Sequence, residues 1–161
     1  METGQTEIRR AVRSDIPKLE ELLLEVLNIH AAGRPDIFIP DTTKYSRDEL
    51  EEMLRDPMRP VFVITDETHT VAGYAMCEIH RRMHSSNMTD IITLFIDDLC
   101  VSKTKRGMHY GARLYEAVKE YARSIHAYHI TLNVWTCNPG AVAFYETIGL
   151  KPMEYVMEEI L

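Results

Sequence analysis

The sequence predicts a mixed α/β fold, in which a sheet of parallel and antiparallel strands carries helices on both faces. Two observations lead to this fold class. Apolar residues recur at helical spacing in some segments and alternate with polar residues in others, which gives the order β-α-α-β-β-β-α-β-α-β. A helical segment also joins the strands predicted at 91–101 and 129–135, and such a crossover makes these two strands parallel.

The first third of the chain predicts one strand and two helices. A short strand at 7–12 precedes a helix that begins after Asp15, a residue type typical of the N-cap position. Glycine and proline residues then predict a loop. Ser46 and Glu49 have the spacing of a capping box, which opens a second helix that ends before Pro57.

The middle of the chain predicts three strands in succession. Strands at 60–66 and 71–79 are close enough to form a hairpin. A polar loop at 81–87 leads into the third strand, at 91–101.

The last third predicts a helix, a strand, a helix and a final strand. Gly111 to Ile125 has helical periodicity, and alternation at 129–135 indicates a strand. Asn138 then caps a helix that ends at Gly149, and residues 151–160 form the last strand of the prediction.

Composition limits the classes of function. The 161 residues predict a single domain spanning 1–161, with 45% hydrophobic and 27% charged residues, as in ordinary soluble proteins. The formal net charge of -7 argues against nucleic-acid binding. Apolar runs are too short to cross a membrane, and no signal segment is visible, so we expect a cytoplasmic protein. Three cysteines without framework spacing predict buried thiols rather than disulfides.

The turn between the strand predicted at 91–101 and the following helix has the features of an anion site. Lys103, Lys105 and Arg106 precede Gly107, and the helix begins near Gly111. Free backbone N–H groups and the positive end of the helix dipole meet at such a turn, which suits a phosphate. The P-loop pattern is absent, and the three glycines of a dinucleotide fingerprint are incomplete.

Two motifs resemble those of the GCN5-related N-acetyltransferase (GNAT) family. The segment 106–112, RGMHYGA, is similar to the R/Q-x-x-G-x-G/A turn of that family. The segment 138–146, NPGAVAFYE, followed by Gly149 and Leu150, is similar to its N-x-x-A-x-x-F-Y-E-x-x-G-F signature. The predicted order of elements is also the family's order. One position departs from the pattern, because His109 stands where the family has its middle glycine.

The resemblance implies a fold with a splayed central parallel strand pair and acetyl-CoA as co-substrate, with no metal. It implies that the turn binds the pyrophosphate, that the strand before it binds the pantetheine arm, and that Asn138 either bonds this arm or caps its helix. His109 either narrows the pocket or donates a hydrogen bond to the phosphate. The expected cofactor-binding residues are Leu99, Cys100, Val101, Arg106, Gly107, Met108, His109, Tyr110, Gly111, Ala112 and Asn138.

Catalysis in this family is direct transfer in a ternary complex, and the resemblance assigns Tyr145 as the acid that protonates the leaving thiolate. The alternative is that Tyr145 only packs in the core. A base for the amine is offered by Asp97 and Asp98. We prefer Asp97, acting directly or through water, because alternation on a strand places it on the side of Phe95, Leu99 and Val101. Asp98 is the second choice.

The acceptor is expected to be a primary amine of a small molecule or peptide. Acidic residues on the first two helices favour a cationic amine, whereas Arg34 favours an acceptor that bears a carboxylate. The rival hypothesis is a noncatalytic acyl-CoA-binding sensor or partner-binding module. No nucleic acid and no membrane are expected as partners, and the resemblance allows a homodimer. His126 and His129 lack a third ligand, so no metal site is predicted.

Overall fold

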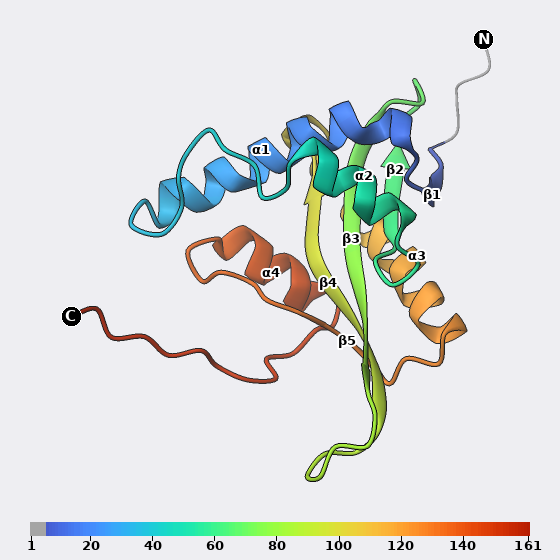
Figure 1. Ribbon diagram of the computed structural model, residues 1–161. Helices are drawn as coiled ribbons and strands as arrows, with labels where there is room; N and C mark the ends of the chain where they lie inside the picture. Colours follow the sequence, from blue (N-terminus) through green and yellow to red (C-terminus); the bar gives the residue numbers. More distant parts are fainter. Residues whose placement is uncertain (1–5) are drawn as a thin grey trace.

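A five-stranded sheet in the order β1-β2-β3-β4-β5 forms the centre of the computed structural model, which describes residues 6–161 (Figure 1). Its strands are β1 (Ile8–Arg10), β2 (Val61–Thr65), β3 (Val71–Arg82), β4 (Ile91–Val101) and β5 (His129–Leu132). The first four strands pair antiparallel, and β4 pairs with β5 in parallel. The predicted mixed sheet and its parallel crossover are confirmed.

Helices cover both faces of this sheet. On one face, α1 (Ile16–Gly33) and α2 (Arg47–Arg55) pack against a buried cluster that includes Val63, Tyr74 and Cys100. On the other, α3 (Tyr110–Ser124) packs against a cluster that includes Ile64 and Leu94. The short α4 (Pro139–Thr147) follows β5, and two 3-10 turns lie at η1 (Arg13–Asp15) and η2 (Lys103–Lys105).

Local sequence signals explain several helix ends. The Ser46 hydroxyl accepts a hydrogen bond from the Glu49 N–H, and the Glu49 carboxylate accepts one from the Ser46 N–H, so the predicted capping box forms at the start of α2. The side chain of Asn138 accepts a hydrogen bond from the N–H of Ala141 and caps α4. Gly149, at φ 102°, follows the end of that helix.

The parallel pair β4 and β5 is only partly joined. Its register runs from Thr93 opposite His129 to Ile96 opposite Leu132, whereas β4 continues to Val101 paired with β3 but not with β5. The predicted divergence of the two central strands is therefore present. It leaves residues 97–101 of β4 without a strand on the β5 side, next to the turn that leads into α3.

The predicted last strand is wrong. Residues 151–161 form no strand, every one of them is exposed, and the sheet ends at β5 (Figure 1). The segment leaves the end of α4 as an extended tail instead of returning to the sheet. Its sequence pattern suits a strand, but a strand also needs a neighbouring backbone, and this tail has none within the described chain.

Candidate active site

The turn between β4 and α3 exposes the start of a helix. Gly107 has φ 77° and His109 has φ 61°, and α3 begins directly afterwards at Tyr110. No side chain caps this helix. The N–H groups of Tyr110, Gly111 and Ala112 therefore lack the intrahelical partners that later residues have. They lie at the positive end of the helix dipole, where an anion is favoured.

The glycine of the family pattern at the helix start has a packing role. A Cβ on Gly111 would lie 3.0 Å from Cζ of Phe144, so the absence of a side chain lets α4 approach α3. Tyr110 contributes its backbone only, because its side chain is buried in the core on the α3 face. At Gly107 the positive φ, and not the available space, explains the glycine, since nothing lies within 4 Å of a Cβ placed there.

Two basic side chains of the turn are bound to acids from distant parts of the chain. The Lys105 ammonium lies 3.0 Å from Asp66 and 3.5 Å from Glu67. The Arg106 guanidinium lies 3.4 Å from Glu25 and donates a hydrogen bond from Nε to the carbonyl of Val101. The charges of Lys105 and Arg106 are thus partly neutralised within the chain.

A β-bulge places Asp97 and Asp98 on the same face of the sheet. Asp98 pairs with Met76 and Ile96 pairs with Cys77, so Asp97 is an extra residue on β4. The expectation that Asp97 shares a side with Leu99 and Val101 is therefore wrong. These two residues pack toward α3, whereas both aspartates contact side chains on the α1 and α2 face.

Asp97 is held by two side chains that precede α2. Lys44 donates to Oδ1 at 2.8 Å, and the Tyr45 hydroxyl donates to Oδ2 at 2.5 Å. Burial, followed by the hydrogen bond to Asp97, raises the pKa of Tyr45 above its ordinary value. Both oxygens of the Asp97 carboxylate thus already accept a hydrogen bond from a neighbouring side chain.

Asp98 lies in a different environment with Tyr74, Cys100 and Tyr145. The Tyr74 hydroxyl donates to Oδ2 of Asp98 at 2.9 Å. Burial raises the pKa of Asp98 from 3.8 to about 6, although the Tyr74 hydrogen bond acts in the opposite direction. Burial also raises the pKa of Tyr145, and the nearby negative charge of Asp98 raises it further. Tyr145 is therefore protonated at neutral pH.

Cys100 is not an activated nucleophile. Its thiol donates a hydrogen bond to the carbonyl of Leu22 in α1 at 3.6 Å. Burial raises the pKa of this thiol to about 12, with smaller contributions from Asp98 and Glu25. Because the thiolate is the reactive form of cysteine, an acyl-cysteine intermediate is disfavoured.

An aromatic cluster lies where α1, the following loop and the end of β5 meet. The rings of His30 and Phe38 are 5.3 Å apart, and those of Phe38 and Trp135 are 5.0 Å apart with edge-to-face geometry. Gly33 permits this approach, since a Cβ there would lie 2.8 Å from Cβ of Cys137. Next to the cluster, Arg34 bonds both Asp36 and Glu158.

The sequence did not identify several of these residues. These residues come from three separate segments and belong to no motif: Lys44 with Tyr45, Tyr74, and Trp135. Only the fold brings them to the aspartates and to Phe38. A lone tyrosine on a buried strand gives no sequence signal that distinguishes it from an ordinary core residue.

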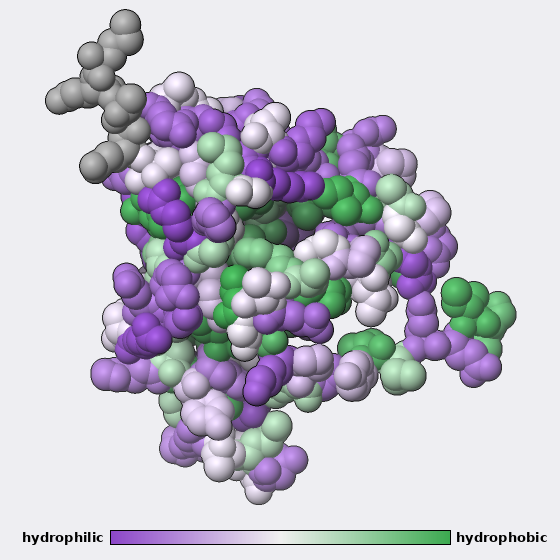
Figure 2. Space-filling model, turned by 180° about the vertical axis from the view of Figure 1, so that it is seen from behind, coloured by the Kyte–Doolittle hydropathy of each residue, from purple (hydrophilic) through white to green (hydrophobic). Residues whose placement is uncertain are grey.

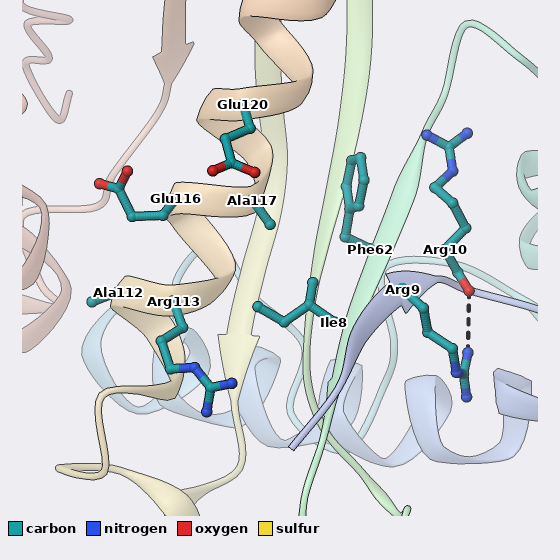
Figure 3. Close-up of a pocket in the computed structure, with 9 residues that line it drawn as sticks. All are labelled: Ile8, Arg9, Arg10, Phe62, Ala112, Arg113, Glu116, Ala117 and Glu120. Carbon is teal, nitrogen blue, oxygen red and sulfur yellow. Dashed lines mark hydrogen bonds between the residues drawn. The ribbon is translucent and has the colours of Figure 1, made fainter. Parts of the chain in front are cut away.

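A groove of about 510 Å³ lies between α1 and the turn and includes Glu25, Lys103 and Arg106. A second groove, of about 650 Å³, lies between β1 and α3 and is lined by Ile8, Phe62 and Arg113 (Figure 3). This second groove includes Ala112 of the candidate cofactor-binding residues but neither aspartate nor Tyr145.

Within residues 6–161, no group of three or more His, Cys, Asp and Glu side chains is arranged to hold a metal ion. No helix in the same range combines the length and the apolar character needed to cross a membrane.

Sequence comparison identifies one family. The sequence model of the acetyltransferase (GNAT) family matches residues 23–150, a range that includes β4, the turn, α3 and α4. Among curated proteins, none has a sequence that matches this chain.

Several solved structures share this architecture. A mutant of the BH1408 protein from Bacillus halodurans has a TM-score of 0.93 and 27% identity, over 96% of this chain and 99% of that chain. An acetyltransferase from Trypanosoma brucei has a TM-score of 0.71 and 22% identity, over 98% and 100%. The aminoglycoside N-acetyltransferase AAC(6')-Iy, in complex with CoA, has a TM-score of 0.72 and 13% identity, over 96% and 98%. At such identities the last two similarities concern the fold.

Proposed function

Because this chain belongs to the GNAT acetyltransferase family, we propose that it transfers the acetyl group of acetyl-CoA to a primary amine, directly and in a ternary complex. One observation carries the proposal. The open side of β4 lies next to the uncapped start of α3, so hydrogen-bonding groups for an extended arm and for a phosphate occur in succession.

The direction of the β4 backbone groups supports a role in holding the thioester. Ser102 donates its N–H to the carbonyl of Ala72 in β3, so by alternation the backbone groups of Cys100 also point to β3. Those of Leu99 and Val101 point the opposite way, to the side that β5 leaves open. These groups suit the amides of a pantetheine arm, and the Leu99 N–H is a candidate to polarise the acetyl carbonyl.

The turn supplies the pyrophosphate site. We assign the diphosphate to the N–H groups at the start of α3, reached past Gly107 and His109. Arg106, which directly precedes Gly107, is assigned to the same site, although Glu25 partly neutralises the charge of its guanidinium group. Asn138 acts mainly as the cap of α4 and is the least direct of the expected cofactor contacts.

We assign the base to Asp98 rather than to Asp97, which reverses the preference drawn from the sequence. Tyr74 binds one oxygen of Asp98, whereas donors bind both oxygens of Asp97. A carboxyl group with a pKa of about 6 is ionised at neutral pH yet basic enough to accept a proton from an ammonium group.

The proposed reaction begins with a proton transfer at the acceptor. Asp98 takes a proton from the substrate ammonium, and the amine nitrogen then attacks the thioester carbon. A C–N bond forms, the nitrogen releases its second proton to solvent, the C–S bond breaks, and the sulfur leaves as thiolate. Tyr145 donates its proton to that thiolate, and solvent restores the proton of Tyr145 and removes that of Asp98.

We propose a cationic amine as the acceptor. Arg34 is already bound to Asp36 and Glu158, so it is not free to hold a substrate carboxylate. The remaining cues are the aromatic rings of Phe38 and Trp135, which offer faces to a cation, and the acids of α1. Whether the amine belongs to a small molecule or to a peptide is decided by the acceptor panel described below.

A noncatalytic acyl-CoA-binding module is the alternative function. Its support is the turn itself, where His109 adopts a left-handed conformation and both Lys105 and Arg106 are bound to acids. A module of this kind would bind the cofactor without needing Tyr145.

The test is acetyl transfer from labelled acetyl-CoA to a panel of polyamines, aminoglycosides, amino acids and lysine peptides, with wild type and Tyr145→Phe. We expect Tyr145→Phe to lower kcat by about 10²–10⁴-fold, the usual contribution of a general acid, while CoA affinity is kept. The matched control is Tyr128→Phe, because Tyr128 is exposed on the surface. Binding of CoA with no transfer to any amine would support the noncatalytic module instead.

A further inference from the structure

A lysine of the chain itself lies where β4 and β5 separate. Lys44 belongs to the loop between α1 and α2, which returns to the sheet beside β4 (Figure 1). Its ammonium donates to the Asp97 carboxylate at 2.8 Å and to the Asp97 carbonyl at 3.3 Å. Asp97 directly follows Ile96, the last residue of β4 that pairs with β5. The Lys44 amine is thus fixed at the fork between the two strands.

The groups proposed for catalysis lie around the same amine. Burial raises the pKa of Asp98, and the positive charge of Lys44 acts on that carboxyl group in the opposite direction. The same charge adds to the effect of burial in lowering the pKa of His30, a member of the aromatic cluster. Tyr145 in turn feels the negative charge of Asp98. The lysine amine is therefore within electrostatic reach of the proposed base and of the proposed acceptor region.

Lys44 differs in this respect from other ion-paired lysines of the chain. Lys18 and Lys119 also bind acids, yet each of those acids lies only three residues away on the same helix. The partner of Lys44 is instead a residue of β4 next to the proposed base. The side chain of Lys44 is 43% exposed, so it is held by the ion pair and not by burial in the core.

The lysine side chain is long enough to deliver its amine to the thioester. The N–H of Leu99, the candidate to polarise the acetyl carbonyl, is two residues beyond Asp97, a distance of about 6–7 Å along an extended strand. Rotation about the flexible four-carbon stem of a lysine moves its ammonium over several ångströms. The amine of Lys44 thus needs to leave only Asp97 to approach the proposed acetyl site.

We propose that Lys44 is an acetyl acceptor within its own chain, which acetylates this Nζ when acetyl-CoA is bound. This self-acetylation rests on the proposed function, because it uses the same base and acid. Asp98 takes a proton from the Lys44 ammonium, and the neutral Nζ attacks the thioester carbon. A C–N bond forms, the nitrogen releases its second proton to solvent, the C–S bond breaks, and Tyr145 protonates the leaving thiolate.

The experiment incubates the full-length protein with acetyl-CoA labelled in the acetyl group, without an added amine, and locates the label by mass spectrometry of peptides. Wild type is compared with Asp98→Asn and Tyr145→Phe. Lys119 is the internal control, because it also binds an acid but lies in the second half of α3. Its labelling measures uncatalysed acetylation. Lys44→Arg keeps the positive charge and should remove the label at this position alone.

We expect Lys44 to be labelled much faster than Lys119, at a rate independent of protein concentration, because amine and cofactor belong to one chain. Asp98→Asn and Tyr145→Phe should each lower the rate at Lys44 by about 10²-fold or more and leave that at Lys119 unchanged. The comparison of Lys44 with Lys119 within wild type does not require any variant to fold.

The amine panel separates failure of this proposal from failure of the proposed function. Transfer to an external amine while Lys44 stays unlabelled overturns self-acetylation alone. Equal labelling of Lys44 and Lys119, a rate that rises with protein concentration, or a rate at Lys44 that is the same in both variants as in wild type also overturns it. If CoA binds and neither Lys44 nor any amine of the panel is acetylated, both proposals fail.

Discussion

At the scale of single residues, the two neighbouring aspartates differ because of what touches them. Asp97 accepts hydrogen bonds from Lys44 and Tyr45, whereas Asp98 accepts one from Tyr74. Burial raises the pKa of the Asp98 carboxyl group toward neutrality, which is the property that a general base needs.

The raised pKa of Asp98 predicts opposite pH dependences for activity and stability. Between pH 3.8 and about 6 the folded state binds more protons than the unfolded state, so the free energy of unfolding falls as the pH rises. Over the same range the value of kcat/KM should rise as Asp98 ionises. Rate profiles and urea unfolding of wild type and Asp98→Asn measure both effects.

Asp98→Asn should lower kcat by at least 10²-fold and remove the fall in stability through this range. The control is Asp97→Asn, which keeps only one acceptor for Lys44 and Tyr45 but should keep the dependence of kcat/KM on a group with a pKa of about 6. If the Asp97 variant loses that dependence and the Asp98 variant keeps it, the base is Asp97.

His109 predicts a variant that binds CoA more tightly. A non-glycine residue in the left-handed conformation costs about 1–2 kcal/mol, and His109 has φ 61° in the turn. His109→Gly should remove this cost and give phosphate closer access to the backbone. We expect a several-fold lower Kd for CoA by calorimetry.

The matched control is His126→Gly, because His126 has φ 57° but follows the opposite end of α3. This variant should change stability in the same direction and leave the Kd for CoA unchanged. Weaker binding by His109→Gly would show instead that the imidazole donates to the phosphate.

At the scale of elements, the contact between α3 and α4 positions the proposed acid. Gly111 allows Phe144 to lie against the start of α3, and Tyr145 is the next residue of α4. A substitution in α3 can therefore shift the position of Tyr145 in α4. The bulge in β4 has a similar effect, since it sets both aspartates on the α1 and α2 face.

Gly111→Ala should disturb this contact, because the new Cβ would lie 3.0 Å from the Phe144 ring. We expect a loss of about 1–3 kcal/mol in the free energy of unfolding, measured with urea, and a lower kcat. Phe144→Leu in the same chain should restore part of both. The control is Gly140→Ala in α4, where the nearest atom is 3.9 Å away; a loss of equal size there would refute the packing argument.

At the scale of the whole molecule, the sheet ends at β5, which pairs only with β4 among the described strands. Residues 151–161 are exposed and do not form a further strand beside it, and Figure 2 shows them as an arm that leaves the body of the protein.

The helices, the parallel strand pair and the turn before α3 could all be predicted from the sequence alone. Periodicity and capping residues were enough for the four helices, for the parallel relation of β4 and β5, and for the position of the turn at Gly107. These properties depend on neighbours within a few residues, or on a crossover whose geometry is fixed by chain connectivity.

The features that depend on contacts between residues far apart in the chain became evident only from the tertiary structure. It set both aspartates on one face, because a bulge exists only relative to the paired strand β3. It bound Lys105 to Asp66 and Arg34 to Glu158, which removed two charges from the expected sites. It also left the tail without a strand to join, since a strand requires a second backbone as well as a suitable sequence.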